Sequence, residues 1–172
     1  MYHVYVESAV VDSSEQARER PLDYQEQKLF YSGKKCNHTL KNQFIVLPHG
    51  KNIVDVVAGR RGPISDINLW RERQREFHFE QRFAGDKAYK GEPQIRTPHK
   101  KPKKQELTAE QKQENREFSS NRIFVEHLIR LVKVFQVAQQ RFRLPVRQYE
   151  AVILTICGLV RLRIGAGSSE SL

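Results

Sequence analysis

Hydrophobic positions are densest in residues 121–135, NRIFVEHLIRLVKVF. On a helix, which turns by about 100° per residue, the charged side chains of this stretch fall within an arc of about 80°, namely those of Arg122, Glu126, Arg130 and Lys133. A helix that is apolar over most of its surface is typical of a protein core. The pattern therefore predicts a core helix with one charged stripe. This stripe is either an edge on which Glu126 pairs with the two arginines or the wall of an active site.

Short apolar runs near the N-terminus have the length and composition of β-strands. Residues 4–6 and 9–11 predict one interrupted strand or two short ones, which end in a polar cluster that begins at Asp12. An acid at the end of a buried strand is either a turn or capping residue or a functional group. The charged segment 16–35, with its proline and Ser-Gly turn, is predicted to be a long exposed loop.

A second group of apolar runs predicts a β-hairpin. Residues 38–47 and 53–57 flank a tight turn, as expected for two antiparallel strands. The glycines and proline of residues 59–63 are predicted to break the second strand. A helical pattern follows, for which Ser65 or Asp66 is a candidate N-cap.

Residues 82–89 predict a short fourth strand that ends on an acid, after which the composition shifts. The segment 96–104 has two prolines that keep it extended, and it carries no acid but five cations, namely Arg96, Lys100, Lys101, Lys103 and Lys104. Such a segment is either a solvated linker or a DNA-binding path. Thr108 is expected to cap a polar helix that runs through Glu117 into the core helix.

The last apolar run, residues 151–160, lies within a predicted final helix over residues 146–162, and residues 165–172 are expected to be a disordered tail. The run is too short to span a membrane, which needs about 18 apolar residues or more. The N-terminus lacks the basic start and apolar stretch of a secretory signal. We therefore expect a cytoplasmic, nucleoid-associated protein without a membrane partner.

Composition narrows the class of partner. The chain has 172 residues, of which 38% are hydrophobic, enough for one domain with a core. Its 30 Lys and Arg residues outnumber 20 Asp and Glu residues and give a net charge of +10. This balance favours a polyanionic partner, either nucleic acid or an anionic membrane surface. Cys36 and Cys157 are too few and too far apart to predict a disulfide framework.

Three acids stand at comparable places in the predicted elements. Asp12 ends the first strand, Asp66 follows the hairpin and Glu126 lies on the core helix, at intervals of 54 and 60 residues. A metal-dependent phosphodiester enzyme needs carboxylates from distant segments, because Mg²⁺ prefers hard oxygen ligands and keeps positions open for water and phosphate. Two such ions, about 3.5–4 Å apart, would activate the attacking oxygen and stabilise the leaving one. Cys36 and His38 lack further ligands at zinc-like spacing.

Six sequence blocks carry a family resemblance. They are VDSSE at 11–15, GKK at 33–35 with HTLKNQ at 38–43, GPISD at 62–66, GDKAY at 85–89, PHKK at 98–101, and RIFVE at 122–126 followed by Lys133. In these blocks the sequence resembles an insertion-sequence transposase of the DDE superfamily, in the group related to Harbinger-type nucleases, and the resemblance spans roughly residues 10–164.

The resemblance implies an α/β fold with a ribonuclease-H-like mixed sheet flanked by helices. The catalytic domain would comprise residues 1–164, with residues 96–118 as a basic linker and polar helix within it. Asp12, Asp66 and Glu126 would form the catalytic triad and bind Mg²⁺ or Mn²⁺. The resemblance also makes other positions candidates: Asp86 matches another recurrent acid of the family, and Arg122 and Lys133 match positions that hold phosphates of the cleaved transposon end.

The implied reaction is hydrolysis at transposon ends, followed by attack of the freed 3′-hydroxyl on target DNA. Ser119 stands where some relatives have a Tyr. Relatives also carry an N-terminal helical DNA-binding region, whereas eleven residues precede Asp12 here. The sequence therefore predicts an N-terminally truncated transposase. The alternative is an inactive remnant that binds DNA or intact transposase subunits without catalysis.

Overall fold

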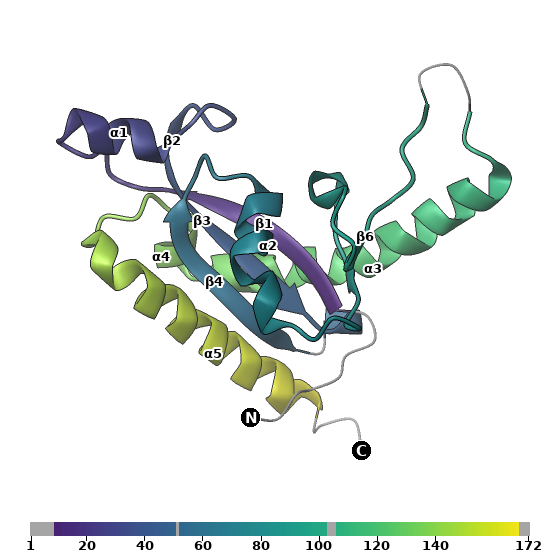
Figure 1. Cartoon of the computed structure of the whole chain (residues 1–172). Helices are drawn as coiled ribbons and strands as arrows, with labels where there is room; N and C mark the ends of the chain where they lie inside the picture. The colour runs from purple at the N-terminus through teal and green to yellow at the C-terminus, as the bar shows by residue number, and fades with distance from the viewer. Residues whose placement is uncertain (1–8, 51, 103–105, 169–172) are drawn as a thin grey trace.

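The structure is a computed structural model, and it describes residues 9–50, 52–102 and 106–168 (Figure 1). Its strands are β1 (Ala9–Ala17), β2 (Tyr31–Ser32), β3 (Asn37–Val46), β4 (Ile53–Arg61), β5 (Phe83–Ala84) and β6 (Ile95–Arg96). Its α-helices are α1 (Tyr24–Phe30), α2 (Asp66–Arg73), α3 (Ala109–Val134), α4 (Gln136–Gln139) and α5 (Tyr149–Ser168). Short 3₁₀ turns connect them, namely η1 (Pro48–Gly50), η2 (Gln74–Glu76), η3 (Lys87–Tyr89) and η4 (Val146–Gln148).

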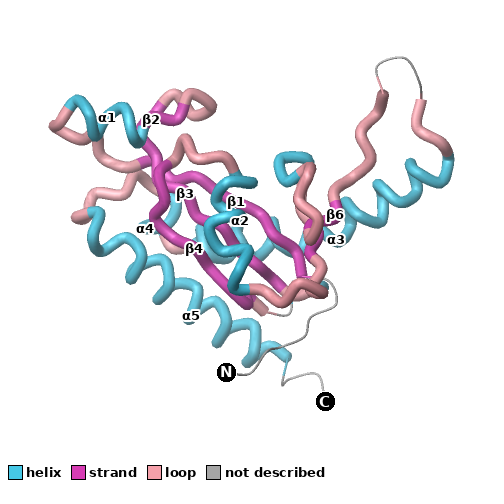
Figure 2. The backbone as a smooth tube through the Cα atoms, viewed as in Figure 1, coloured by secondary structure: helices cyan, strands magenta, loops and turns pink. Residues whose placement is uncertain are grey.

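Strand β3 lies at the centre of the sheet (Figure 2). One edge of β3 pairs antiparallel with β1, and the other edge pairs antiparallel with β4 and with the short β2. On its far side β1 pairs in parallel with β5, which in turn pairs in parallel with β6. The result is a six-stranded mixed sheet flanked by helices, so the predicted mixed α/β, ribonuclease-H-like fold class is confirmed.

Helices α3, α4 and α5 cover one face of this sheet, which we call the α3 face (Figure 1). Strand side chains point alternately to the two faces, and those on this face are buried against the helices. The core of the α3 face includes Val10, Phe44, Leu128, Phe142, Tyr149 and Ile153. Tyr149 is fixed at its polar end as well, because its hydroxyl accepts from Asn42 Nδ2 at 2.7 Å and donates to Gln16 Oε1 at 2.9 Å.

The opposite face, which we call the α2 face, has a smaller and more aromatic core. Trp70 of α2 stacks on Phe77 with ring centroids 5.2 Å apart and meets Phe83 edge-on at 4.7 Å. Val11 and Tyr89 complete the contact between the helix and the sheet. Aromatic pairs at these separations stabilise by about 0.5–1.5 kcal/mol beyond burial alone, so α2 is anchored firmly beside β1.

Two predicted strand ends are wrong. β1 does not end before Asp12 but continues to Ala17, because its polar second half pairs with an equally polar stretch of β3, with Ser13 opposite Gln43 and Glu15 opposite Lys41. β4 likewise continues through Gly59 to Arg61. Gly59 has a φ of +74°, which glycine adopts without strain, and its N–H donates to the Asn42 side chain at 3.1 Å.

The predicted loop over residues 16–35 is also partly wrong. It contains α1, whose N-cap Asp23 accepts from Glu26 N, and then β2. The predicted fourth strand over residues 82–89 is reduced to Phe83–Ala84 in β5. After that pair the chain turns into η3, with Asp86 as its N-cap.

Helix α3 confirms the predicted cap at Thr108, but its apolar segment is less buried than predicted. Thr108 forms a capping box with Gln111, and one continuous helix joins the polar segment to the apolar one. Only one side of the apolar segment is buried, with Val125 fully inaccessible while Ile123 is 46% and Val134 65% exposed. The stretch is therefore an amphipathic helix against a sheet rather than a helix surrounded by core.

The remaining predictions concern the hairpin, the Ser65 cap, the final helix and the two ends of the chain. The hairpin, the Ser65 cap and the final helix are present as β3–β4, α2 and α5. The predicted disordered tail begins inside α5, which extends to Ser168, and residues 169–172 lie outside the described residues. The strand predicted at residues 4–6 also lies outside them. Among the described helices, none has the length and apolar character that a membrane crossing requires.

Candidate active site

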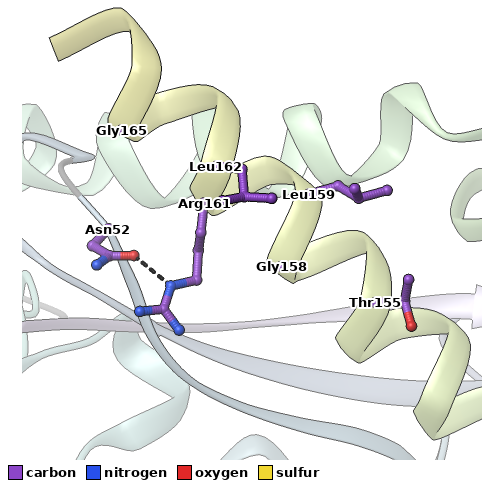
Figure 3. A pocket seen from close by; sticks show the side chains of 7 residues that line it. All are labelled: Asn52, Thr155, Gly158, Leu159, Arg161, Leu162 and Gly165. Carbon is purple, nitrogen blue, oxygen red and sulfur yellow. Dashed lines mark hydrogen bonds between the residues drawn. The ribbon is translucent and has the colours of Figure 1, made fainter. Parts of the chain in front are cut away.

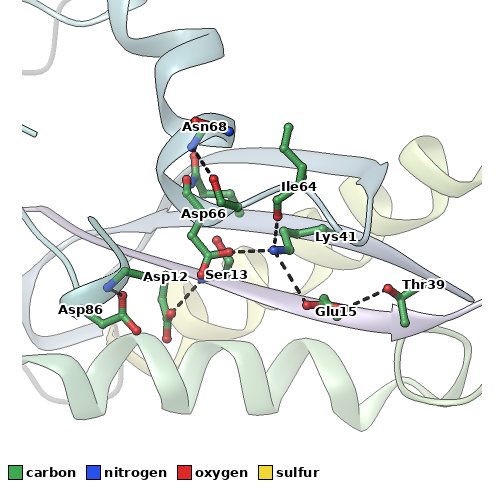
Figure 4. A network of polar contacts seen from close by, with 12 residues as sticks. Asp12, Ser13, Glu15, Thr39, Lys41, Ile64, Asp66, Asn68 and Asp86 are labelled. Carbon is green, nitrogen blue, oxygen red and sulfur yellow. Dashed lines mark hydrogen bonds and ion pairs between the residues drawn. The ribbon is translucent and has the colours of Figure 1, made fainter. Parts of the chain in front are cut away.

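The parallel pairing of β1 with β5 brings two acids to the same level of the sheet. Val10 is the register partner of Ala84, and two residues further along each chain stand Asp12 and Asp86. Neighbouring strands lie about 4.8 Å apart, so the two acids leave the end of the parallel pair next to each other. Figure 4 shows the carboxylates of Asp12 and Asp86 on the same side of β1. The Asp86 side chain is fixed because Asp86 is the N-cap of η3, and its Oδ1 accepts from Ala88 N at 2.8 Å.

The third acid of this group comes from α3. Asp12 shares the orientation of Val10, which belongs to the α3 face, because side chains two apart on a strand point the same way. Arg122 of α3 lies between the two elements, with Nη2 3.8 Å from Asp12 Oδ2 and 3.9 Å from Glu126 Oε1. Arg122 therefore links the carboxylate of β1 to the carboxylate of α3.

Burial and neighbouring charges act together on Asp12. Burial raises the pKa of Asp12, and the carboxylates of Asp86 and Asp66 raise it further. The N–H of Ser13, which donates to Asp12 Oδ1 at 2.8 Å, and the Arg122 guanidinium act in the opposite direction and lower this pKa. Like charges around a buried carboxylate disfavour its ionised form. A cation bound here would relieve that repulsion.

Asp66 lies in a different environment, on the α2 face. It is the first residue of α2, behind the Ser65 cap. Its Oδ1 accepts from Lys41 Nζ at 3.0 Å, and the same ammonium lies 3.8 Å from Glu15 Oε1. Lys41 also donates to the carbonyl of Ile64. The Lys41 side chain is 8% exposed and the Asp66 side chain 22%. Asp66 therefore belongs to a largely buried ionic network that fixes the start of α2 to the sheet, although its carboxylate stays partly accessible (Figure 4).

The donor chemistry of these acids fits a hard divalent cation, whose preferred ligands are carboxylate oxygens. Within the described ranges, however, no three acidic, histidine or cysteine side chains are already arranged as a metal-binding group. The contacts explain this, because Arg122 lies between Asp12 and Glu126 while Lys41 holds Asp66. The predicted triad is thus divided between the two faces of β1, and Asp86 is the acid in register with Asp12.

Lys133 and Arg122, the predicted phosphate-binding cations, differ in their burial and in their interaction partners. Lys133 is half-buried, and burial together with the nearby Lys35 ammonium lowers the pKa of Lys133 against an opposing effect of Asp12. Arg122 has a buried Nε without a hydrogen-bond partner among the described residues. Ser119 donates to the Asn115 carbonyl of its own helix at 2.8 Å.

The basic segment is partly neutralised within the chain. Arg96 pairs with Glu114 at 3.5 Å, and Lys101 pairs with Glu106. Lys100 is exposed, whereas Lys103 and Lys104 lie outside the described residues. Two of the five cations are therefore paired with acids at or near the start of α3. This pairing favours the solvated linker over the DNA-binding path.

Several residues that shape the site were not singled out from the sequence. Lys41 closes the network on the α2 face, and the hydroxyl of Tyr89 bonds with Ser13 and Gln43 at 3.0 Å each. Tyr89 and Lys41 lie inside the blocks that carry the family resemblance, but their roles depend on cross-strand register. A separate cavity of about 740 Å³ lies along α5, where Arg161 donates to Asn52, and it contains none of the candidate acids (Figure 3).

Comparison with known proteins places this geometry in a family. The family model described as DDE superfamily endonuclease matches residues 11–161. A relative from Microchaete diplosiphon, the probable transposase for insertion sequence element IS702, is 37% identical over 138 residues, which are 78% of this chain. The aligned part is 49% of that relative, so the chain spans about half its length. No solved structure matches the chain significantly. Because the family model covers most of the sequence, from the strand with Asp12 to the final helix, the chain belongs to the DDE superfamily endonuclease family.

Proposed function

We propose that this chain is the catalytic domain of a DNA transposase, which cleaves transposon ends in a metal-dependent reaction and joins them to target DNA. One observation carries the proposal. The parallel register of β1 and β5 sets Asp12 beside Asp86, and Arg122 connects Asp12 to Glu126. Family membership and the match to a probable insertion-sequence transposase support the same substrate.

We further propose that Asp86, rather than Asp66, is the second acid of the site. Asp12, Asp86 and Glu126 are the residues that would hold the cation, Mg²⁺ or Mn²⁺. When bound, a divalent cation would neutralise charge on the scissile phosphate and promote ionisation of the attacking hydroxyl group. Asp66 would act behind them, since its bond to Lys41 positions α2 beside β1.

The side chains around the acids support phosphodiester chemistry. In the first step a water oxygen bonds to phosphorus, the bond to the 3′ oxygen breaks, and that oxygen takes up a proton to leave a free 3′-hydroxyl. In the second step this hydroxyl attacks a target phosphate and displaces another 3′ oxygen. Arg122, placed between the acids, would bind a phosphate of the substrate at the edge of the site. Lys133 would add a second positive charge on the same helix.

A nicking assay tests this proposal. The purified chain, with supercoiled plasmid and Mg²⁺ or Mn²⁺, should convert supercoiled DNA to the open circle, and Glu126→Gln should abolish that conversion. Glu110→Gln is the matched control, because it makes the same chemical change on an exposed residue of the same helix that has no side-chain partner among the described residues.

The competing function is a remnant that binds DNA or intact transposase subunits without cleaving. The position of Arg122 between two of the acids favours it, because a guanidinium there competes with a metal cation. Nicking that persists unchanged in Glu126→Gln would remove this residue from the site. Plasmid binding without nicking, with either metal, would establish the remnant instead.

A further inference from the structure

Lysines make up half of the residues that line a small cavity beside the candidate acids. Its volume is about 170 Å³, far more than the roughly 10–15 Å³ that one water needs. The lining residues come from β1, from the turn between β2 and β3, from β3, from the start of α2 and from α3. They are Ser13, Ser14, Glu15, Lys34, Lys35, Lys41, Asp66 and Lys133. We call this the lysine cavity.

The hairpin turn between β2 and β3 supplies two of these lysines. Ser32 and Asn37 are the last paired residues of the hairpin, so the loop comprises residues 33–36. Lys35 N donates to Ser32 O at 3.2 Å, and Cys36 adopts a φ of +48°. A left-handed non-glycine residue is sterically disfavoured, so this turn has a defined shape. Lys34 and Lys35 of this turn are exposed, and both line the cavity over β1.

The charges in the cavity do not balance. Its two acids, Glu15 and Asp66, both lie against the Lys41 ammonium. In the part of the chain that the structure describes, the amines of Lys34, Lys35 and Lys133 make no hydrogen bond or ion pair. The mutual repulsion of Lys35 and Lys133 helps to lower the pKa of Lys133. Unpaired ammonium groups gathered in one recess favour the binding of an anion.

The position of the cavity suggests which anion it binds. The last β5 residue that pairs with β1 is Ala84, opposite Val10, so from Asp12 to Gln16 the outer edge of β1 has no strand partner among the described residues. The acids stand at the start of this open edge. Ser13, Ser14 and Glu15, which line the cavity, follow Asp12 directly along β1, and Ser14, the middle one, is about 7 Å from Asp12 at 3.4 Å per residue. That separation is comparable with the distance between neighbouring phosphates along a nucleic-acid strand.

We propose that the lysine cavity binds a backbone phosphate of the DNA strand whose neighbouring phosphate lies at the carboxylates. Lys34 and Lys35 of the turn and Lys133 of α3 are the groups that hold it. This proposal rests on the proposed function for the identity of the ligand. It adds the residues of the hairpin turn to the DNA-binding surface. It also predicts that the DNA strand runs along the open edge of β1, from the carboxylates toward the cavity.

DNA binding without cleavage tests the cavity. The full chain is titrated with a fluorescein-labelled short duplex in Ca²⁺ or EDTA over a range of salt concentrations, and anisotropy is measured. If the cavity holds one phosphate, Lys34→Gln/Lys35→Gln should lower the log–log salt slope by about 0.9 and weaken binding about eightfold at about 0.1 M salt. Arg147→Gln/Arg163→Gln is the matched control, since it removes the same charge from exposed positions beside and on α5. It should leave the slope unchanged.

Lysine acetylation provides a readout on the wild-type chain. An amine-reactive acetyl ester, followed by mass spectrometry of peptides, should show Lys34 and Lys35 protected when the duplex is bound and exposed Lys28 of α1 unprotected. DNA that binds without protecting the two lysines, or equal slopes for variant and control, overturns the cavity and leaves the proposed function intact. Protection without any metal-dependent nicking overturns the catalytic proposal and supports the cavity. A chain that does not bind DNA contradicts both.

Discussion

The two faces of β1 use the same kinds of charged residue in opposite ways. On the α2 face, Asp66 and Glu15 are closed around the buried Lys41. On the α3 face, Asp12 Oδ1 accepts from Ser13 N at 2.8 Å, but the Arg122 guanidinium stands 3.8 Å from its carboxylate. Burial, together with like charges nearby, raises the pKa of Asp12. An acid whose partners are satisfied stabilises the fold, whereas an acid that lacks a close cation is available for a ligand. The comparison teaches that packing, rather than residue type, separates structural acids from candidate catalytic ones.

The largest expected effect concerns the two aspartates that the comparison separates. Asp86→Asn should reduce metal-dependent nicking by more than the roughly 10–100-fold typical of residues that stand behind metal ligands. Asp66→Asn should retain measurable nicking but lower the free energy of unfolding by about 2 kcal/mol, because a hydrogen bond to a charged group contributes about 1.5–3 kcal/mol. Nicking rates and urea unfolding of both variants give the answer. Loss of nicking in Asp66→Asn with Asp86→Asn active would contradict the proposal and support the predicted triad of Asp12, Asp66 and Glu126.

The next effect tests whether the α2 face is a closed network. Lys41→Met should lower the free energy of unfolding by about 3–5 kcal/mol, since it leaves two acids in a largely buried site without their cation. Glu15, whose side chain is 7% exposed, is the more buried of the two. Adding Glu15→Gln to Lys41→Met should recover part of the loss. A midpoint of urea unfolding that does not change in Lys41→Met would show that the network does not stabilise the fold.

Two buried tyrosines offer a smaller and more symmetrical comparison. Adjacent residues of β3 donate to them, Asn42 to Tyr149 on the α3 face and Gln43 to Tyr89 on the α2 face. Tyr149→Phe should cost about 2 kcal/mol and Tyr89→Phe about 1 kcal/mol, within the usual cost of about 1–3 kcal/mol for a buried polar group left unsatisfied. The difference arises because Gln43 Nε2 keeps a bond to the Asp66 carbonyl at 3.3 Å. Equal unfolding midpoints for the two variants would contradict it.

The smallest effect is a pH dependence within the core of the α3 face. Burial raises the pKa of Cys157 from 9.0 to about 11. The buried neutral thiol therefore contributes its full stability below the unfolded pKa of 9.0, and that contribution is lost as the pH rises through about 11. At about pH 8, iodoacetamide should label exposed Cys36 and leave Cys157 unmodified, because the thiolate is the nucleophile. Equal labelling of both thiols in the native chain would show that α5 opens readily.

Much of the fold follows from local pattern. The capping box at Thr108, the Ser65 cap and the hairpin of β3 and β4 were predicted because each depends on neighbouring residues. The extension of β1 beyond Asp12 was not predicted. Ser13 and Ser14 have low intrinsic preference for strands, and only their pairing with Gln43 and Asn42 of β3 keeps them extended.

The candidate site was predictable in kind but not in detail. Acids on β1 and α3, Asp12 and Glu126, were identified from the sequence, and the structure connects them through Arg122. The proposal that Asp86, rather than Asp66, is the second acid required the register of two strands more than seventy residues apart in sequence, together with the position of Lys41. The strand register and the position of Lys41 are both set by tertiary contacts, so they cannot be deduced from the spacing of acids along the chain.

The parallel register of β1 and β5 also bears on which sequence changes the site tolerates. The spacing of Asp12 and Asp86 is set by main-chain pairing, so apolar substitutions at Val10 or Ala84 that preserve the strand pair leave both acids in place. A single-residue insertion or deletion between Val10 and Asp12, or between Ala84 and Asp86, acts differently. On β1, where side chains alternate, such a change turns Asp12 toward the other face. After β5, which ends at Ala84, it shifts Asp86 along the connection to η3 and out of level with Asp12. The site should therefore tolerate changes of apolar side chain at Val10 and Ala84 better than changes of chain length beside them.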